Sequence, residues 1–321
     1  MSLFATLKNS YSQMKAEGIL GMNCRNGRYI SRYNDRSLYP LVDDKLLTKK
    51  LAIKHNLKVP ELFGVIQYQH EIEDLDKLIK GKNGFCLKPS KGSGGKGILV
   101  ILDTRQTEDG PQFKKTNNEW IELSVLKRHV SNIIAGLYSL GGAIDKVLIE
   151  KLIVLDPYFD DFSYEGIPDI RVIVFRGMPV MAMMRLSTAA SDGKANLHQG
   201  AVGVGIAMES GRALRAVQKD EVITHHPDTK VDLTTLEVPH WDRLLRLACR
   251  CADITGLGYI GVDLVLDREL GPLVLELNAR PGLSIQVANG RGLKGILERV
   301  ETLEGLDRFS IDERISYLPR L

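Results

Sequence analysis

The stretch "GPLVLELNARPG", residues 271–282, places polar side chains inside an apolar run that is typical of a buried strand. Glu276 and Asn278 lie two positions apart, so on a strand they would project from the same face. A carboxylate and a carboxamide together offer the hard oxygen atoms that Mg²⁺ prefers in proteins. The question is therefore what lies opposite them.

The preceding strand-like run, "YIGVDLVLD", supplies a second carboxylate. If the turn "DRELG" pairs Leu266 with Leu273, Asp263 lies opposite Glu276, because the sum of paired residue numbers is constant along a regular hairpin. Two carboxylates that close destabilise a sheet unless a cation neutralises them. The sequence therefore predicts a Mg²⁺ site at Asp263, Glu276 and Asn278. A solvated acidic strand face is the alternative.

A glycine-rich stretch, "KPSKGSGGKG" at residues 88–97, joins two further strand-like runs. It is not a Walker A motif, because a strand and not a helix follows it. The pattern predicts a β-hairpin with a glycine-rich tip, whose backbone N–H groups can close over phosphates. Lys88, on the first strand, is placed to reach the α- or β-phosphate. An ordinary glycine-rich loop is the alternative.

Basic and amide side chains accompany these motifs. Arg171 stands in "DIRV" and Arg185 ends "VMAMMR", while "SDGKANLHQGA" contains Lys194, Asn196 and His198. Cationic groups that face one cleft suit a triphosphate, whose charge is redistributed during transfer. Separate surface charges are the alternative reading. His226, in "THHPDTK", is expected in a proline-containing surface turn and not at a metal.

The elements that must position these residues mix strands and helices without regular βαβ alternation. This pattern predicts an α+β fold with antiparallel sheets. Residues 1–40 show no clear long element after an opening helix, and residues 104–120 are expected to be a polar connection. Helices are expected at 43–56, 72–81, 122–140 (ended by Gly141-Gly142) and 240–256, and in the tail from 291; hairpins are expected at 84–103, 169–187, 200–218 and 259–278.

Composition excludes several classes of protein. The chain has 321 residues, with 43 Lys and Arg against 40 Asp and Glu, so its net charge of +3 does not favour nucleic acid or membrane as the main partner. No run reaches the roughly 18 apolar residues of a membrane span. The four cysteines lack zinc-like spacing, which favours reduced thiols and a cytoplasmic location.

The ordered set of motifs resembles the ATP-grasp superfamily. "LKPSKGSGGKGI", "LIEKLI", "DIRV", "ANLHQGA", "GVDLVLD" and "LELNARPG" follow one another as in RimK-type glutamate ligases, and the short N-terminal part resembles the sugar-transfer-associated branch. The resemblance implies two α+β lobes with antiparallel sheets that hold ATP between them. The expected organisation is an N-terminal segment at 1–40, an N-lobe at 41–155 with a helical segment at 121–140, and a C-lobe at 156–321.

The resemblance also implies roles for single residues. Those expected to bind ATP are Lys45, Lys88, Ser93, Gly94, Gly95, Gly97, Glu150, Lys151, Leu152 and Asp156. Those expected to hold two Mg²⁺ ions, with Mn²⁺ as a substitute, are Asp263, Glu276 and Asn278. Those expected to face the γ-phosphate or an acyl phosphate are Arg171, Lys194, Asn196 and Arg280.

The function implied is an ADP-forming ligase that joins a carboxylate and an amine through an acyl phosphate. Glutamate added to a peptide, protein or cell-surface acceptor is the expected reaction. An ATP-binding accessory module and an ATP-grasp phosphotransferase are the alternatives. Few residues precede Lys45, so the N-terminal preATP-grasp domain is expected to be reduced or absent, with a partner protein or a second copy replacing it. The arginines of residues 25–36 either order the N-terminus or bind an anionic substrate.

Overall fold

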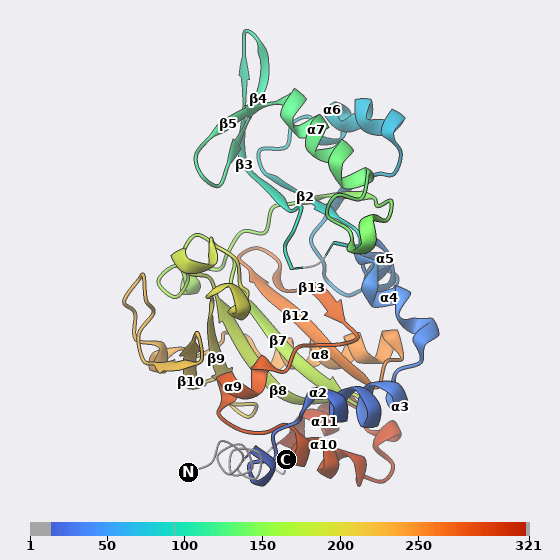
Figure 1. The fold of residues 1–321 in the computed structure, drawn as a ribbon, viewed down its shortest axis with the longest axis vertical. Helices are drawn as coiled ribbons and strands as arrows, with labels where there is room; N and C mark the ends of the chain where they lie inside the picture. Colours follow the sequence, from blue (N-terminus) through green and yellow to red (C-terminus); the bar gives the residue numbers. More distant parts are fainter. Residues whose placement is uncertain (1–13, 93, 319–321) are drawn as a thin grey trace, which may run out of the picture. The chain divides into compact units, whose positions relative to one another are not determined.

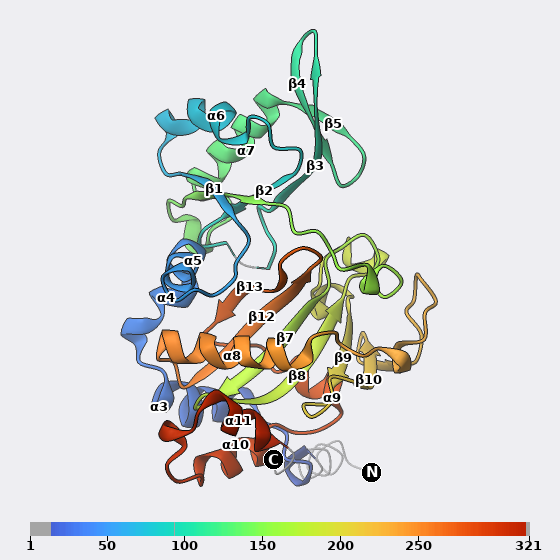
Figure 2. The same ribbon diagram turned by 180° about the vertical axis from the view of Figure 1, so that it is seen from behind.

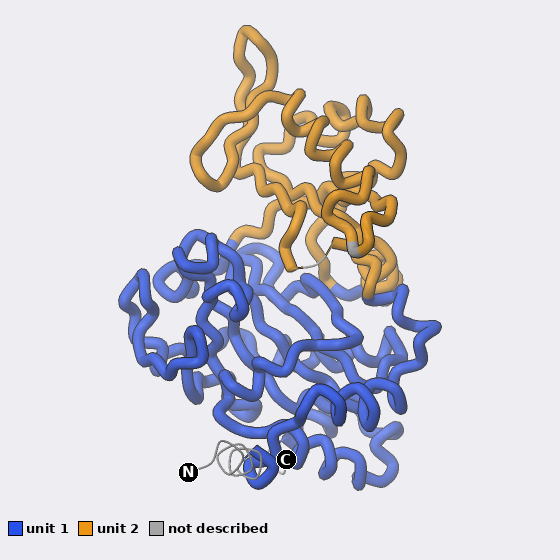
Figure 3. Tube along the Cα trace, viewed as in Figure 1, with its two compact units in different colours: residues 1–42, 55–57, 155–321 blue, residues 43–54, 58–154 orange. Residues whose placement is uncertain are grey.

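A computed structural model of the chain describes residues 14–92 and 94–318. The chain forms two compact units (Figure 3). Of the described residues, unit 1 contains those within Met1–Val42, His55–Leu57 and Leu155–Leu321, and unit 2 contains those within Asp43–Lys54 and Lys58–Val154. Residues of the expected N-terminal segment therefore group with the C-terminal unit.

Unit 2 is built on a six-stranded antiparallel sheet with the order β1-β6-β2-β3-β4-β5. Its apolar core lies between the sheet and helices α6 and α7. The strands are β1 (Leu62–Ile66), β2 (Phe85–Pro89), β3 (Leu99–Thr107), β4 (Gly110–Lys115), β5 (Trp120–Glu122) and β6 (Val147–Lys151), and the α-helices are α5 (Lys45–Lys54), α6 (Leu75–Ile79) and α7 (Leu123–Ile134). The hairpin expected around the glycine-rich loop is confirmed, since β2 pairs with β3.

Two expectations for unit 2 are wrong. Residues 104–120 are not a connection, because β3 and β4 form a hairpin through them and β5 follows. From Asp103 onward these strands are polar and half-buried or exposed except at Phe113, so they lack the apolar alternation that predicts a strand. Helix α7 ends at Ile134 and not before Gly141-Gly142. Gly136 follows with φ +85°, where a Cβ would lie 2.5 Å from the carbonyl oxygen of Ala143.

Unit 1 is built on a seven-stranded antiparallel sheet with the order β11-β10-β9-β8-β7-β12-β13. Together with unit 2 it confirms the expected α+β fold with antiparallel sheets. The strands are β7 (Asp169–Phe175), β8 (Met178–Leu186), β9 (Val202–Ile206), β10 (Ala213–Gln218), β11 (Glu221–Ile223), β12 (Tyr259–Asp267) and β13 (Gly271–Asn278). The three hairpins expected in this region are all present.

Helices cover both faces of this sheet. Helix α8 (Trp241–Thr255) packs against β7, β12 and β13, and α9 (Ser284–Asn289) packs against β8, β9 and β10. They lie on opposite faces (Figure 1 and Figure 2). Ile173 and Met183 belong to the apolar core on the α9 side. Arg171, two residues before Ile173 on β7, projects from the same face.

The ends of the chain add helices to that core. Residues 22–33 form a continuous helical run, comprising α2 (Met22–Cys24), the π-helical turn Arg25–Ile30 and α3 (Ser31–Tyr33). The sequence did not indicate this run, because its Gly and Asn residues are poor helix formers and tertiary packing stabilises it. Tyr29 is fully buried against Phe175. Short helix α4 (Pro40–Asp43) follows, and the expected helical tail is confirmed as α10 (Lys294–Glu301) and α11 (Ile311–Ser316).

Within the described residues, no helix has both the length and the apolar composition needed to cross a membrane. The four cysteines are free thiols, and Cys249 and Cys251 on α8 are buried.

Candidate active site

The hairpin of β12 and β13 places Asp263 opposite Glu276, as expected. The strand register that produces this pairing differs from the expected one. Leu266 pairs with Pro272 and not with Leu273, and the register shifts by one residue at a β-bulge between Asp263 and Leu264. The bulge restores the expected pairing beyond it, where Gly261 pairs with Asn278.

Asp263 is neutralised by two arginines, of strands β7 and β8. It is 2% exposed and pairs across the sheet with Arg171 of β7. The Arg171 side chain donates two hydrogen bonds, Nε to Oδ1 at 2.8 Å and Nη2 to Oδ2 at 2.7 Å. Nη2 of Arg185 donates to Oδ2 at 2.8 Å. Two guanidinium groups thus already neutralise the Asp263 carboxylate, so its closeness to Glu276 does not by itself require a metal cation. The Mg²⁺ site stays a prediction.

A second buried carboxylate completes the cluster. Asp169 lies opposite Arg185 in the β7–β8 ladder and accepts two hydrogen bonds from it, including one from Nη2 at 2.6 Å. Burial raises the pKa of Asp169, and the neighbouring Asp263 carboxylate adds to that effect. Burial acts in the same direction on Asp263, but Arg171 and Arg185 outweigh it and hold the pKa of that carboxyl well below its usual range. Asp263 is therefore ionised at neutral pH.

The donor set remains compatible with Mg²⁺. Asp263 Oδ1 accepts one hydrogen bond, from Arg171, and each carboxylate oxygen has two lone pairs. Asn278 donates its Nδ2 to Asp263 Oδ2 at 3.3 Å, so its carbonyl oxygen is the atom available to an ion. Glu276 is half-buried in the same row of the sheet. Among the described residues no cluster of three or more His, Cys, Asp or Glu side chains is arranged for a metal, so an ion here would need ligands from water or substrate.

In unit 2, a buried carboxylate binds two lysines. Glu150 of β6 is 3% exposed, and its Oε2 lies 2.5 Å from Lys88 Nζ. Its Oε1 lies 2.9 Å from Lys49 Nζ on α5. Burial lowers the pKa of Lys49, and the Glu150 charge opposes that effect. The three side chains carry two positive charges and one negative charge, which favours an added anion such as a phosphate.

Several contacts hold the glycine-rich loop at its base. Lys45 Nζ donates to the Gly92 carbonyl oxygen at 2.7 Å, and His129 Nε2 lies 3.0 Å from the Gly97 carbonyl oxygen. Gly94, Gly95 and Gly97 all adopt positive φ values, between +62° and +76°. Such values suit glycine, so the loop sequence agrees with its backbone. Ser93, the remaining predicted residue of the loop, lies outside the described residues.

The other predicted residues make mostly local contacts. Lys194 is exposed and pairs with Asp192, while Asn196 Oδ1 accepts from the His198 N–H in the same loop. Asp156 caps a short 3-10 helix by accepting from the Tyr158 N–H. Of the remaining predicted residues, Lys151 ends β6, Leu152 follows it half-buried, and Arg280 is exposed with its guanidinium carbon 5.3 Å from the Tyr39 ring centroid.

The sequence analysis omitted two charged residues that the structure brings into these clusters, Lys49 and Asp169, and gave Arg185 no individual role. The first two had a signal in the sequence. Lys49 lies four residues after Lys45, hence on the same side of a helix, and Asp169 lies two residues before Arg171 on a strand.

His226 is fully buried, contrary to the expected surface turn, and its Nε2 lies 3.1 Å from the Ser187 carbonyl oxygen. Its Nδ1 accepts from two backbone N–H groups, of Asp228 and Thr229, so Nε2 carries the proton and donates. The ring thus fixes the start of the loop that contains Lys194. Nothing in the short motif "THHPDTK" distinguishes such a buried role from an exposed one.

Comparisons with known proteins agree with this architecture. Residues 24–302 match the model of the sugar-transfer associated ATP-grasp family. A probable alpha-L-glutamate ligase of Parasynechococcus marenigrum is 25% identical over 272 residues, covering 84% of this chain and 43% of the relative. One of Psychromonas ingrahamii is 32% identical over 255 residues, covering 79% of this chain and 61% of the relative.

The chain thus spans between 43% and 61% of the length of these relatives. A crystal structure of the D-cycloserine synthetase DcsG superposes with a TM-score of 0.47 at 14% identity, covering 86% of this chain and 73% of that one. The family match covers most of the chain and includes both sheets. The chain therefore belongs to the sugar-transfer associated ATP-grasp family.

Proposed function

We propose that this chain is an ADP-forming ligase that joins a carboxylic acid to an amine. The observation that carries the proposal is one face of the unit 1 sheet, on which β7, β8, β12 and β13 place hard oxygen donors beside two guanidinium groups. Such a set suits a reaction in which negative charge moves between phosphoryl and carboxyl oxygens. The lysine–glutamate cluster of unit 2 supports it, since its net positive charge suits a nucleotide phosphate.

The proposed ligase reaction has two steps. A carboxylate oxygen of the acid attacks the γ-phosphorus of ATP, the bond from that phosphorus to the bridging oxygen breaks, and ADP leaves. The amine nitrogen then attacks the acyl carbon of the resulting acyl phosphate, phosphate leaves, and the nitrogen loses a proton. The protein positions reactants and stabilises charge, so no nucleophilic side chain is needed.

The proposed roles follow the position of each residue. Mg²⁺ held by Asp263, Glu276 and Asn278 would neutralise phosphate oxygens. Arg171 holds Asp263 in its ionised form, and its guanidinium lies beside the row of side chains proposed to hold Mg²⁺. Arg280 extends beyond the strand end and would contact the transferred phosphoryl group, with Lys194 and Asn196 of the 187–200 loop.

In unit 2, the proposed nucleotide-binding residues are Lys45, Lys88, the glycine-rich loop and Glu150, with Lys151 and Leu152. Asp156, at the start of the C-terminal stretch of unit 1, is the remaining proposed one. The curated relatives are named probable alpha-L-glutamate ligases, which supports glutamate as one of the two substrates.

The test is a screen for ADP release against amino acids, peptides and amino sugars as paired acids and amines. Hydroxylamine added to the reaction should give a hydroxamate, because it intercepts an acyl phosphate. Glu276→Gln should abolish release, whereas Glu269→Gln, the same change in the exposed turn of the same hairpin, should leave it unchanged.

Other outcomes decide between the alternatives. A phosphorylated acceptor without an amide would identify a phosphotransferase. ATP binding without ADP release in every mixture would identify an accessory module and refute the proposed ligase.

A further inference from the structure

Three consecutive residues that follow Asn278 are each contacted by the N-terminal segment, defined here as residues 22–39. Asn34 Nδ2 donates to the Ala279 carbonyl oxygen at 3.2 Å. The Tyr39 ring lies beneath the Arg280 guanidinium, 5.3 Å from centroid to carbon. Arg25 Nη1 donates to the Pro281 carbonyl oxygen at 2.7 Å. The post-strand loop, residues 279–282, therefore has its own set of partners outside the sheet.

Asn34 replaces the sheet's hydrogen bonding where the ladder ends. The β12–β13 pairing stops at Gly261 and Asn278. Beyond it, the buried Asn34 side chain accepts from the Tyr259 N–H at 2.8 Å and donates to the Tyr259 carbonyl oxygen at 2.7 Å. The same amide group reaches Ala279. One side chain thus ties the first residue of β12 to the residue that directly follows the predicted metal ligand Asn278.

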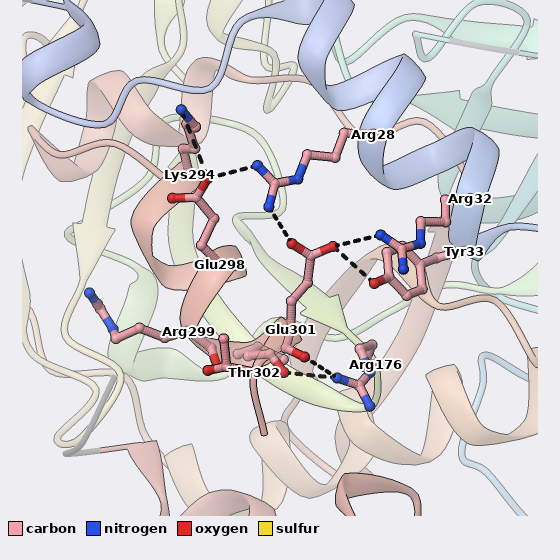
Figure 4. A network of polar contacts seen from close by, with 10 residues as sticks. Arg28, Arg32, Tyr33, Arg176, Lys294, Glu298, Arg299, Glu301 and Thr302 are labelled. Carbon is pink, nitrogen blue, oxygen red and sulfur yellow. Dashed lines mark hydrogen bonds and ion pairs between the residues drawn. The ribbon is translucent and has the colours of Figure 1, made fainter. Parts of the chain in front are cut away.

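Separate contacts attach the N-terminal segment to α10 (Figure 4). Arg28 forms ion pairs at 2.7 Å with both Glu298 and Glu301, and the Tyr33 hydroxyl donates to Glu301 at 2.9 Å. Arg32 lies 3.7 Å from Glu301. These arginines are paired with carboxylates, which favours their role in ordering the N-terminus over binding of an anionic substrate. The segment is thus fixed on one side to a helix and contacts the post-strand loop on the other.

We propose that the N-terminal segment is a positioning element of the active site, acting through Arg25, Asn34 and Tyr39 on the post-strand loop. The inference rests on the proposed function of Asn278 and Arg280. Arg280 has an exposed, long side chain with many accessible rotamers. The Tyr39 ring restricts that freedom through a cation–π contact. The Pro281 contact fixes the backbone on the far side of Arg280.

The test uses the full chain with four variants and one matched control. Arg25→Ala and Tyr39→Leu remove single contacts to the loop, while Arg25→Lys and Tyr39→Phe retain a donor or a ring. Arg32→Ala is the control, since it removes an exposed arginine of the same segment that contacts α10 and not the loop.

The first measurement is hydrogen exchange in a peptide that covers residues 278–284. Exchange should accelerate about five-fold in Arg25→Ala and Tyr39→Leu, the effect of one lost hydrogen bond or contact of ordinary strength. It should remain at the wild-type rate in the control and in both conservative variants. Unchanged exchange in the first two variants, or equal acceleration in the control, would overturn the proposal.

The second measurement is steady-state ADP release. Tyr39→Leu should lower kcat about ten-fold or more with little change in the KM for ATP, because a mispositioned Arg280 weakens contacts made in the transition state. Tyr39→Phe should restore kcat. A raised KM at constant kcat would contradict a positioning role. If the wild-type chain releases no ADP in any mixture, the proposed function fails, while the exchange experiment still decides whether the segment orders the loop.

Discussion

Removal of the Glu150 carboxylate should destabilise unit 2 in a pH-dependent way. Glu150→Gln leaves Lys49 and Lys88 buried, with side-chain exposures of 5% and 8%, and without the carboxylate that both contact. Loss of one partner from a buried ion pair costs about 3–5 kcal/mol. The protein can limit this loss by releasing a proton from one lysine, which at pH 7 costs about 4.6 kcal/mol for a group with an ordinary pKa near 10.4. The cost of an unpaired buried charge and the cost of deprotonating a lysine are thus similar, so we expect the free energy of unfolding to fall by about 3–5 kcal/mol at pH 7.

The sign of the pH dependence follows from the same reasoning. In the variant, the pKa of one buried lysine is depressed in the folded state, while the unfolded chain binds the proton normally. Stability must then rise with pH, because the unfolded state binds more protons. Between pH 7 and pH 9 the deficit should shrink by up to about 2.7 kcal/mol, at about 1.36 kcal/mol per pH unit.

The assay is urea unfolding at pH 7, 8 and 9, followed by the fluorescence of Trp120. This residue lies on β5 of the same unit, and Trp241→Phe in every protein removes the signal of unit 1. Glu119→Gln is the matched control, since it breaks the exposed ion pair with Lys115 and should cost far less than Glu150→Gln at every pH. A deficit below that of the control, or one that does not change with pH, would refute the reasoning about a buried charge.

Three further outcomes are expected. Burial lowers the pKa of His226, so the stability it contributes is present above about pH 6.5 and is lost as the pH falls; His226→Gln should flatten the dependence of the urea midpoint between pH 7.5 and 5, and an unaltered slope would contradict this. Arg185→Met should lower the free energy of unfolding by about 3–5 kcal/mol at pH 7, and by less at pH 5, because Asp169 then takes up a proton. Urea unfolding at both pH values measures this loss, and equal losses would contradict the described interaction of Arg185 with Asp169. Gly97→Ala would place a Cβ 2.6 Å from the Tyr138 ring, so it should destabilise the glycine-rich loop more than Gly94→Ala, whose Cβ meets no atom within 4 Å. Hydrogen exchange of residues 90–98 compares the two variants, and an equal effect would mean that the positive φ alone causes the destabilisation.

The hairpin that carries Asp263 and Glu276 could be predicted because local signals agree there. Apolar alternation, a turn with glycine and a fixed period of two determine which side chains share a face. The bulge could not be predicted, since no residue type marks it in this stretch. Leu266 was therefore assigned the wrong partner, although the pairing of Asp263 with Glu276 is confirmed.

The sequence alone did not predict which charged side chains the tertiary structure brings into contact. The neutralisation of Asp263 depends on Arg171 and Arg185, which reach it from two other strands. The contact of Glu150 with Lys49 joins a strand to a helix about a hundred residues earlier in the chain. Such pairs arise from the packing of whole elements, and one sequence records the elements but not their packing. The paired arginine Arg28 shows the same limit, because its charge alone suggested a substrate as readily as a structural role.

The bulge in the β12–β13 hairpin has a consequence for insertions and deletions. Leu275 is the extra residue, since Glu276 pairs with Asp263 and Val274 with Leu264. Without a bulge, the register set at the turn would pair Glu276 with Val262, so Glu276 would turn toward the α8 face and away from Asp263. Leu275 thus absorbs a one-residue mismatch between the turn and the site. Its deletion by one codon should leave Glu276 opposite Asp263 in a regular ladder, whereas a one-codon insertion beside it would place Glu276 opposite Val262 and invert the site while each existing amino acid stays unchanged.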